Sequence, residues 1–380
     1  MKQDLPIFID TPELLIDSIP KLEYSDLLAV DTELDSYFSY QEHICLVQIS
    51  TPTQDFIFDP LAIDITPLAP LFSDPRRTVI FHAGMNDIPH LRHEFNFNFA
   101  DIFDTYLAAG VLNYPKRGLA FLLEEHFNII LDKQYQRADW RQRPLSEEML
   151  QYARYDTAYL FALRTELLKE LEEKGRLEDA QYAFQRAAAA KFHAKTFDST
   201  GWAKIKGINN IPRSRYGIVR ELFIWREHEA QRHNIQPFRI MPDYAILQLA
   251  AAPPKSEQEL KELNIIKHLD KYPNQSAAVF SAITAGKRIG TVCFPKPKKS
   301  DRIILNAQEQ QRLHNLKEWR AQTVIADNMA SEFLLNNSEI FALAQFAPRN
   351  IGDLQNSHIL PPHILRKYGE AIIAALNKGV

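Results

Sequence analysis

The stretch Leu27-Leu28-Ala29-Val30-Asp31-Thr32-Glu33 consists of four apolar residues followed by two carboxylates that are one residue apart. The apolar run predicts a buried strand, and residues i and i+2 of a strand point to the same face of the sheet. Asp31 and Glu33 are therefore expected to project together. Two like charges at the end of an apolar strand are costly unless a cation lies between them. Two interpretations stay open, a divalent-metal site and an exposed strand end with solvated acids.

The composition is that of an ordinary soluble globular protein, with 46% hydrophobic and 24% charged residues among 380. A chain of this length predicts two or three domains. The N-terminal residues, Met1 to Pro6, lack the pattern of a signal peptide, and no apolar stretch approaches membrane-spanning length. Cys45 and Cys293 have no metal-ligand spacing and are expected to be reduced. We therefore expect a cytoplasmic protein with no membrane partner.

The net charge of −4 conceals an asymmetry along the chain. Residues 1–200 hold 19 Lys and Arg against 32 Asp and Glu, whereas residues 201–299 hold 17 against 8. Residues 300–380 hold 8 of each. The acidic first half predicts cation binding, and the basic middle predicts contact with a polyanion such as nucleic acid. Solvated charged faces are the alternative interpretation.

Strand and helix patterns alternate in the first half of the chain. Strands are predicted at 7–9, 27–33, 44–49, 56–58 and 78–82, and helices near 12–22 and 63–72. The short turn at Thr51–Thr53 favours antiparallel pairing, because a parallel crossover needs a dozen or more residues. After the strand at 78–82 the pattern is helical to about residue 196, and Asp104 is expected to be a helix N-cap. We therefore expect a mixed sheet of five or six strands covered by helices.

Two further acids lie where a partner is expected. Asp87 begins a predicted helix five residues after His82, a position that also suits the helix macrodipole. Asp156 lies at the edge of an apolar helical run and shares a face with Tyr152, four residues earlier. A surface Asp156 paired with Arg154 or a lysine is the alternative. His82 is expected to be a packed or hydrogen-bonded core residue.

Together these residues resemble the DEDD superfamily of 3′–5′ exonucleases, in its Tyr-containing branch, and specifically ribonuclease D. The three motifs match Val30-Asp31-Thr32-Glu33, Phe81-His82-Ala83-Gly84-Met85-Asn86-Asp87 and Tyr152 to Asp156. The segments Leu131-Asp132-Lys133, Asp139-Trp140 and Arg143-Pro144-Leu145-Ser146 are also similar to ribonuclease D. The chain departs from bacterial ribonuclease D at Met85-Asn86, where a Ser-Glu pair is common. Because Asp87 itself is retained, the departure is expected to alter the fit of the substrate rather than to abolish activity.

The resemblance implies an α/β ribonuclease H-like exonuclease domain that uses two divalent cations, Mg²⁺ or Mn²⁺. By the same resemblance, Asp31 bridges both metals, and Glu33 and Asp156 hold the metal that activates water. Asp87 then supports the second metal through waters. Tyr152 is expected to orient the attacking water, because a phenol with an ordinary pKa near ~10 is a poor general base.

The rest of the chain contains a repeat with a period of 94 residues. Leu222, Trp225, Arg226, Asn234, Asp243, Ala250, Pro254 and Leu260 correspond to Leu316, Trp319, Arg320, Asn328, Asn337, Ala344, Pro348 and Leu354. The spacing predicts two copies of a small helical domain. The first copy resembles the HRDC domain, and the second is a more divergent copy. We expect an exonuclease domain at 1–200, HRDC domains at 201–293 and 300–380, and an exposed linker at 294–300.

Exposed cations of the first copy are the predicted RNA contacts, because basic residues bind phosphates without reading sequence. The candidates are Lys204, Lys206, Arg213, Arg215, Lys287 and Arg288, together with Arg141 and Arg143 near Trp140. A solvated arginine face is the alternative for the last two. The neutral second copy is expected to enclose the active site or to brace the first copy.

These observations predict a monomeric 3′–5′ exoribonuclease that releases nucleoside 5′-monophosphates from structured RNA 3′ ends. By resemblance, tRNA precursors are the expected substrate class. A single-stranded DNA exonuclease and a non-catalytic RNA-binding protein are the alternatives. The motifs do not separate RNA from DNA, because recognition of the 2′-hydroxyl leaves no mark in them. The set of four acids argues against a purely binding role.

Overall fold

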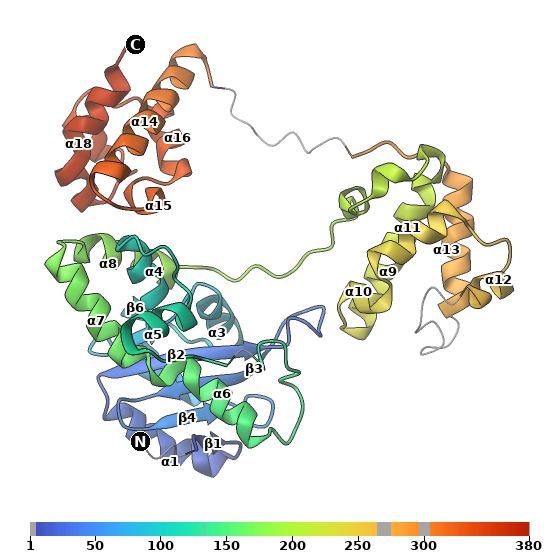
Figure 1. The fold of residues 1–380 in the computed structure, drawn as a ribbon, viewed down its shortest axis with the longest axis horizontal. Helices are drawn as coiled ribbons and strands as arrows, with labels where there is room; N and C mark the ends of the chain where they lie inside the picture. The colour runs from blue at the N-terminus through green and yellow to red at the C-terminus, as the bar shows by residue number, and fades with distance from the viewer. Residues whose placement is uncertain (1–4, 133, 264–274, 296–304, 380) are drawn as a thin grey trace. The chain divides into compact units, whose positions relative to one another are not determined.

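The structure is a computed structural model that describes residues 5–132, 134–263, 275–295 and 305–379. The chain divides into two compact units. Unit 1 comprises Met1–Leu34, Ile44–Phe192 and Ile303–Val380, and unit 2 comprises Asp35–His43 and His193–Arg302. The helices and strands of each unit are labelled in Figure 1.

Within the described residues, unit 1 is built on a six-stranded sheet in the order β1-β4-β3-β2-β5-β6. The strands are β1 (Ile7–Ile9), β2 (Leu27–Leu34), β3 (Ile44–Ser50), β4 (Asp55–Phe58), β5 (Thr78–Phe81) and β6 (Ile102–Asp104). Strand β3 pairs antiparallel with β2 and β4, whereas the pairs β1–β4, β2–β5 and β5–β6 are parallel. The prediction of a mixed sheet with an antiparallel β3–β4 pair is confirmed.

Strand β6 corrects one prediction, because Ile102–Asp104 lies in the stretch that the sequence pattern assigns to helix alone. Its two apolar residues are followed at once by Asp104, which the sequence pattern assigns to a helix N-cap, so no apolar run marks the strand. Asp104 also caps the next helix, as predicted, by accepting the backbone N–H of Leu107 at 3.0 Å. Its carboxylate accepts the N–H groups of Ala83 and Gly84 as well, at 3.2 and 2.8 Å. Strand β6 therefore fixes the loop that leads to Asp87.

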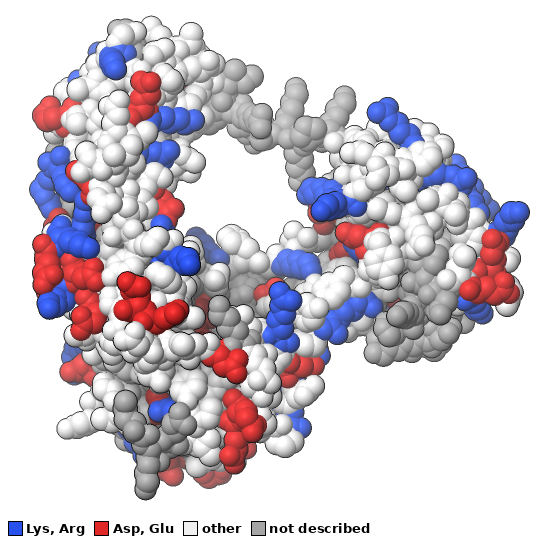
Figure 2. Space-filling view, in the orientation of Figure 1, with Lys and Arg blue, Asp and Glu red and all other residues white. Residues whose placement is uncertain are grey.

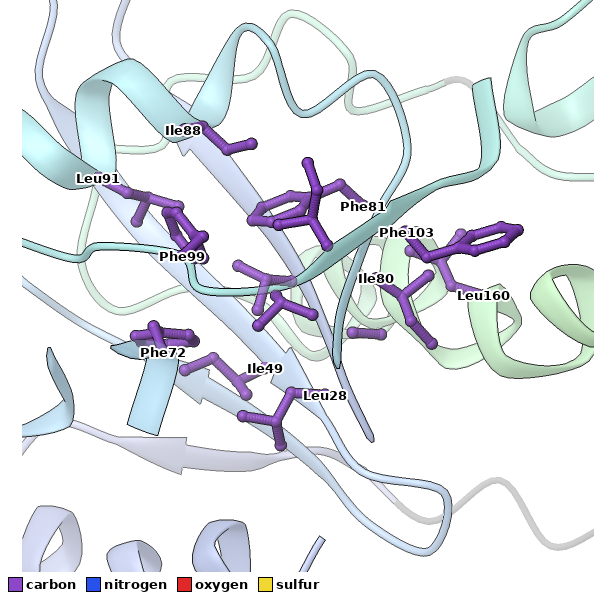
Figure 3. Close-up of a cluster of buried hydrophobic side chains, with 14 of the residues drawn as sticks. Leu28, Ile49, Phe72, Ile80, Phe81, Ile88, Leu91, Phe99, Phe103 and Leu160 are labelled. Carbon is purple, nitrogen blue, oxygen red and sulfur yellow. The ribbon is translucent and has the colours of Figure 1, made fainter. Parts of the chain in front are cut away.

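Helices of the same unit pack against this sheet. They are α1 (Pro12–Glu23), α2 (Ala69–Ser73), α3 (Asp87–Phe95), α4 (Thr105–Val111), α5 (Leu119–Phe127), α6 (Glu147–Ala158), α7 (Leu160–Glu173) and α8 (Leu177–Ala188). The helix expected at 63–72 is shorter and begins as the 3₁₀ turn Thr66–Leu68, because prolines are accommodated at the start of a helix rather than inside it. Figure 3 shows Leu28, Phe81, Phe103 and Leu160 among the side chains of one buried hydrophobic cluster.

The second repeat copy, here the C-terminal copy, belongs to unit 1. It contains α14 (Ala307–Ala326), α15 (Ser331–Leu334), α16 (Asn337–Phe346), α17 (Ile351–Asn356) and α18 (Pro362–Asn377). Arg176, just before α8, donates to the carbonyl oxygen of Asp327 at 2.5 Å. Arg366 of α18 forms an ion pair with Glu178 of α8 at 2.7 Å. The C-terminal copy is therefore bonded to the part of unit 1 that contains the sheet.

Unit 2 contains the first repeat copy. Its helices are the 3₁₀ turns η2 (Gly201–Lys204), η3 (Ile208–Asn210) and η4 (Arg213–Arg215), and α9 (Tyr216–His233), α10 (Pro237–Ile240), α11 (Asp243–Ala251), α12 (Glu257–Glu262) and α13 (Gln275–Ile289). The loop between β2 and β3 belongs to this unit, because Tyr40 is buried in its core. The backbone N–H of Gln236 donates to the carbonyl oxygen of Phe38 at 3.1 Å.

The repeat appears in the structure as one conserved bonding pattern in both copies. Arg226 donates to Asp243 at 2.6 Å and to the carbonyl oxygen of Met241 at 3.1 Å. Arg320, 94 residues later, donates to Asn337 at 3.1 Å and to the carbonyl oxygen of Leu335 at 2.6 Å. The predicted limits of the three domains stay predictions, and residues 296–304, at the linker and the start of the third, lie outside the described residues. No described helix is both long and apolar enough to cross a membrane.

Candidate active site

Three carboxylates converge at the end of β2. One oxygen from each of Asp31, Glu33 and Asp156 lies within 4.8 Å of the others. Asp31 and Glu33 are two residues apart on one strand and so share a face, as predicted. The β2–β3 register shifts between Glu33 and Leu34, so the regular pairing of β2 is interrupted directly after its second carboxylate.

Asp156 reaches this group from α6, which lies against β2, β3 and β4. The side chain of Ser146 caps the helix by accepting the N–H of Met149. The hydroxyls of Thr157 and Ser50 are 2.7 Å apart and join α6 to β3. Arg154 pairs with Asp55 of β4, so the alternative in which it neutralises Asp156 is not what the structure shows.

Asp87, the fourth predicted ligand, lies at the first position of α3 and borders this group without joining it. Its carboxylate accepts a hydrogen bond from the hydroxyl of Thr32, the residue between Asp31 and Glu33. The charge of Asp87 raises the pKa of both Asp31 and Asp156. All four predicted acids therefore lie at one end of β2. Three of them are close enough to one another to bind a single metal ion.

The electrostatics of the group favour a bound cation. Burial raises the pKa of Asp31 and of Glu33 well above the usual range, and the neighbouring carboxylates raise it further. Burial and the charge of Asp87 raise the pKa of Asp156 to about 7. Burial raises the pKa of Asp87 to about 6, although the Thr32 hydrogen bond opposes the change. A divalent cation removes the repulsion that holds these protons on.

The donor set fits a hard divalent cation. All three converging groups are carboxylates, the ligands that Mg²⁺ and Mn²⁺ prefer, and the described group contains no His or Cys. Two members of the group, Asp31 and Asp156, line a pocket of about 450 Å³. Its lining residues are Asp31, His82, Lys116, Gly118, Leu119, Ala120, Phe121, Leu131, Asp132, Gln136, Tyr152 and Asp156.

Tyr152 lines this pocket from α6, one turn before Asp156. Its ring lies 5.8 Å from the ring of Tyr135 and 6.0 Å from that of buried Trp140, measured between centroids. Burial and the charges of Asp156, Glu33 and Asp31 raise the pKa of its hydroxyl above the usual range. The phenol therefore keeps its proton at neutral pH and is available as a hydrogen-bond donor.

His82 also lines the pocket, but a hydrogen bond and burial constrain it, as predicted for a core residue. Its Nδ1 lies 2.8 Å from the hydroxyl of Thr105, which donates to the carbonyl oxygen of Phe81. Burial lowers the pKa of His82 to about 4, so the imidazole is neutral at physiological pH.

Arg143 is bonded within the chain. Its guanidinium forms a two-point ion pair with Asp59, at 2.5 and 2.6 Å, and donates to the carbonyl oxygens of Trp140, Gln142 and Cys45. These bonds attach the loop after α5, which lines the pocket, to the sheet. Arg141 pairs with Asp139 at 2.7 Å. Contact of Arg141 and Arg143 with RNA stays a prediction that these bonds do not support.

The cations predicted to contact RNA in the first copy differ in what they bind. Lys204 pairs with Asp198 at 2.8 Å, Lys287 donates to the carbonyl oxygen of Pro254 at 2.9 Å, and Arg215 is partly buried. The remaining candidates, Lys206, Arg213 and Arg288, are exposed. Figure 2 shows Lys and Arg spread over the visible face of unit 2, with fewer Asp and Glu.

The sequence reasoning did not identify the pocket wall formed by Lys116 and Gly118 to Phe121. Lys116 is the only Lys or Arg among the described residues that line this pocket. Pro115 interrupts the helical pattern and so indicates a loop here, but the sequence gives no reason to place this loop near Asp31. Asp132 belongs to a segment that is similar to ribonuclease D but had no assigned role, and Gln136 lies between two of those segments.

Comparison with known proteins supports this picture at the level of families. A model of the 3′–5′ exonuclease domain matches residues 6–172, and a model of the HRDC domain matches residues 205–272 and 309–376. The exosome complex exonuclease RRP6 of Saccharomyces cerevisiae is 32% identical over 379 residues, covering 93% of this chain and 51% of that protein. The chain spans about half the length of this relative. It spans 34% of a plant relative and 29% of a human one.

A ribonuclease D from Gluconacetobacter diazotrophicus is 28% identical and covers 77% of this chain and 75% of that protein. The crystal structure of the catalytic core of RRP6 from Trypanosoma brucei has a TM-score of 0.66 at 29% identity and covers 75% of this chain and 81% of that one. Along this chain, the exonuclease match is followed by the two HRDC matches. The chain therefore belongs to the DEDD-type 3′–5′ exonucleases of the ribonuclease D and RRP6 type, a family of hydrolases that carry HRDC domains.

Proposed function

We propose that this chain is a 3′–5′ exoribonuclease that depends on two divalent cations and releases nucleoside 5′-monophosphates from RNA 3′ ends. The observation that carries the proposal is the convergence of Asp31, Glu33 and Asp156 within 4.8 Å, with Asp31 and Asp156 lining a pocket. Asp31, Glu33 and Asp156 would hold Mg²⁺ or Mn²⁺, with Asp87 beside them. Such ions supply charge neutralisation on the phosphate, activation of water and stabilisation of the leaving oxygen.

Residues of the pocket would orient the attacking water and bind the end of the RNA. The protonated hydroxyl of Tyr152 donates a hydrogen bond that orients the attacking water, because its raised pKa makes it a poor base. Lys116 supplies a positive charge to a phosphate of the terminal nucleotides. Leu119, Leu131 and Phe121 give the pocket an apolar wall against which a base packs.

RNA is the proposed substrate because the relatives include a ribonuclease D and because unit 2 is basic. The exposed Lys206, Arg213 and Arg288 of the first copy would hold the RNA backbone without reading its sequence. Resemblance to ribonuclease D supports 3′-extended tRNA precursors as the RNA class. By the same resemblance we propose a monomer that acts in the cytoplasm.

The test is incubation of the full chain with a 3′-extended RNA and a matched DNA, in Mg²⁺, Mn²⁺ or EDTA. Expected is stepwise shortening of the RNA from its 3′ end, release of nucleoside 5′-monophosphates, and complete loss of shortening in EDTA. Cleavage that continues in EDTA would contradict metal dependence. Faster shortening of the DNA would replace RNA by single-stranded DNA as the substrate.

A further inference from the structure

One wall of the active-site pocket is the loop between α4 and α5. Lys116 and Gly118 of this loop line the pocket together with Asp31 and Asp156. The ammonium of Lys116 lies 5.4 Å from the centroid of the Phe121 ring, so the first turn of α5 supports it. The place of the loop therefore decides where this positive charge stands relative to the acids.

The same loop is bonded to the C-terminal copy. The guanidinium of Arg117, the residue between Lys116 and Gly118, lies 2.5 Å from the carboxylate of Glu332 in α15. It also lies over the ring of Phe333, 5.6 Å from the centroid. At the start of the loop, the side-chain amide of Asn113 donates to that of Asn328 at 2.9 Å.

Gly110 of the exonuclease domain leaves space for the side chain of Phe333. A Cβ atom at Gly110 of α4 would lie 2.7 Å from two atoms of the Phe333 ring and 2.9 Å from a guanidinium nitrogen of Arg117. Only glycine leaves room for the ring at this closeness. Phe333 packs against the core of the exonuclease domain as well as against that of its own copy.

We propose that the C-terminal copy positions the substrate pocket, with Arg117 as the positioning residue that acts through Lys116. In this arrangement Glu332 and Phe333 hold the loop Asn113–Gly118 so that Lys116 faces the acids and binds a phosphate at the RNA 3′ end. The inference rests on the proposed function and extends it, because it assigns the C-terminal copy a role in substrate affinity.

The alternative is that these contacts only dock the C-terminal copy, and a second ion pair provides the matched control. Arg366 and Glu178 join α18 to α8 at 2.7 Å, and neither residue lines the acidic pocket. Both this pair and the Arg117–Glu332 pair are largely or partly exposed, so each contributes modestly to docking. A docking role predicts similar effects when either pair is removed, whereas positioning predicts an effect of one alone.

The experiment compares Glu332→Gln, Phe333→Ala and Arg366→Gln in the full chain, with steady-state shortening of a 3′-extended RNA in Mn²⁺. Glu332→Gln is expected to raise KM about threefold and Phe333→Ala about tenfold, with kcat within a factor of two. Arg366→Gln is expected to change neither. Arg117→Lys, which keeps the charge, is expected to retain more affinity than Arg117→Gln.

The decisive readout is a double-variant cycle with Lys116→Gln. If Glu332 acts through Lys116, Glu332→Gln has no further effect on KM once Lys116 is neutral. An equal effect of Glu332→Gln in both backgrounds, or an equal effect of Arg366→Gln, would overturn the inference. The same cycle is measured as the Kd for a 3′-labelled RNA in EDTA, so an inactive wild-type chain would contradict the proposed function while the inference is still tested.

Discussion

The hydroxyl of Thr32 donates a hydrogen bond to the carboxylate of Asp87, although 55 residues separate them in the chain. Thr32 lies between Asp31 and Glu33, so one strand supplies two of the converging acids and also fixes the fourth acid beside them. The bond lowers the pKa of Asp87, which burial raises to about 6. Thr32 therefore holds Asp87 beside the two acids of the first motif.

Replacement of this hydroxyl should move the acid side of the pH–rate profile. In Thr32→Val the pKa of Asp87 rises because the hydrogen bond that favours its charged form is lost. We expect the acid limb of kcat/KM to shift to higher pH, with a loss of roughly two- to tenfold at pH 6.5 and less at pH 8.5. Thr78→Val removes a similar hydroxyl–carboxylate bond, to Asp101, and serves as the control. An acid limb that stays in place in Thr32→Val would contradict this role.

Stability of the metal-free chain should fall as the pH rises from about 4 to about 7. Unfolded carboxyls titrate near ~4, whereas burial raises the pKa of Asp156 to about 7 and of Asp31 well above its usual range. In that window the folded state binds more protons than the unfolded state, so the free energy of unfolding decreases with pH.

The variant Asp156→Asn isolates this effect. In EDTA at pH 8 it should be more stable than the wild type by on the order of 1–2 kcal/mol, and the difference should shrink at pH 5, where Asp156 is protonated. Mn²⁺ should stabilise the wild type more than the variant. Urea unfolding at both pH values checks this, and a difference that does not depend on pH would contradict it.

Arg143 is expected to act on stability rather than on RNA affinity. Removal of its charge in Arg143→Gln leaves the buried carboxylate of Asp59 without its two-point partner. We expect the free energy of unfolding to fall by about 1–3 kcal/mol. Arg141→Gln breaks the more exposed pair with Asp139 and should cost less than ~0.5 kcal/mol. Unchanged stability with weaker RNA binding in Arg143→Gln would favour direct RNA contact instead.

The exposed cations of unit 2 should give RNA binding its dependence on salt. In a variant with Lys206→Gln, Arg213→Gln and Arg288→Gln, the slope of log K against log salt should fall by about 2. The measurement is fluorescence anisotropy of a labelled RNA in EDTA. The salt concentration is varied from about 50 to about 200 mM, because contacts with phosphates weaken strongly over this range.

A control variant neutralises three exposed lysines of unit 1, Lys21, Lys169 and Lys317. It makes the same change in net charge and should leave the salt slope close to that of the wild type. Equal slopes for both triple variants would contradict a specific role of the first copy.

Local patterns in the sequence predicted much of the fold and the acids. The apolar run before Asp31 gave the central strand, and the 94-residue repeat predicted that Arg226 and Arg320 occupy equivalent places. The structure shows them bonded to Asp243 and Asn337 in the same way. Such features depend on residues a few positions apart or on an internal copy of the same pattern.

Contacts between distant segments were not predictable in this way. Strand β6 is three residues long and is recognised only by its pairing with β5. Lys116 lines the pocket together with Asp31 and Asp156, which are far from it in the chain, and Gly110 contacts Phe333 from more than 200 residues away. Nothing in the sequence near either residue indicates its partner.

The most direct test of the central claim, that the carboxylates at the end of β2 hold the ions of a nuclease, is the activity of purified Asp31→Ala. The measurement is shortening of a 3′-extended RNA in Mn²⁺, together with circular dichroism to show that the fold is intact. We predict a folded variant whose activity is lost, because Asp31 shares its site with both Glu33 and Asp156. A folded Asp31→Ala variant with full activity would contradict the metal-dependent mechanism.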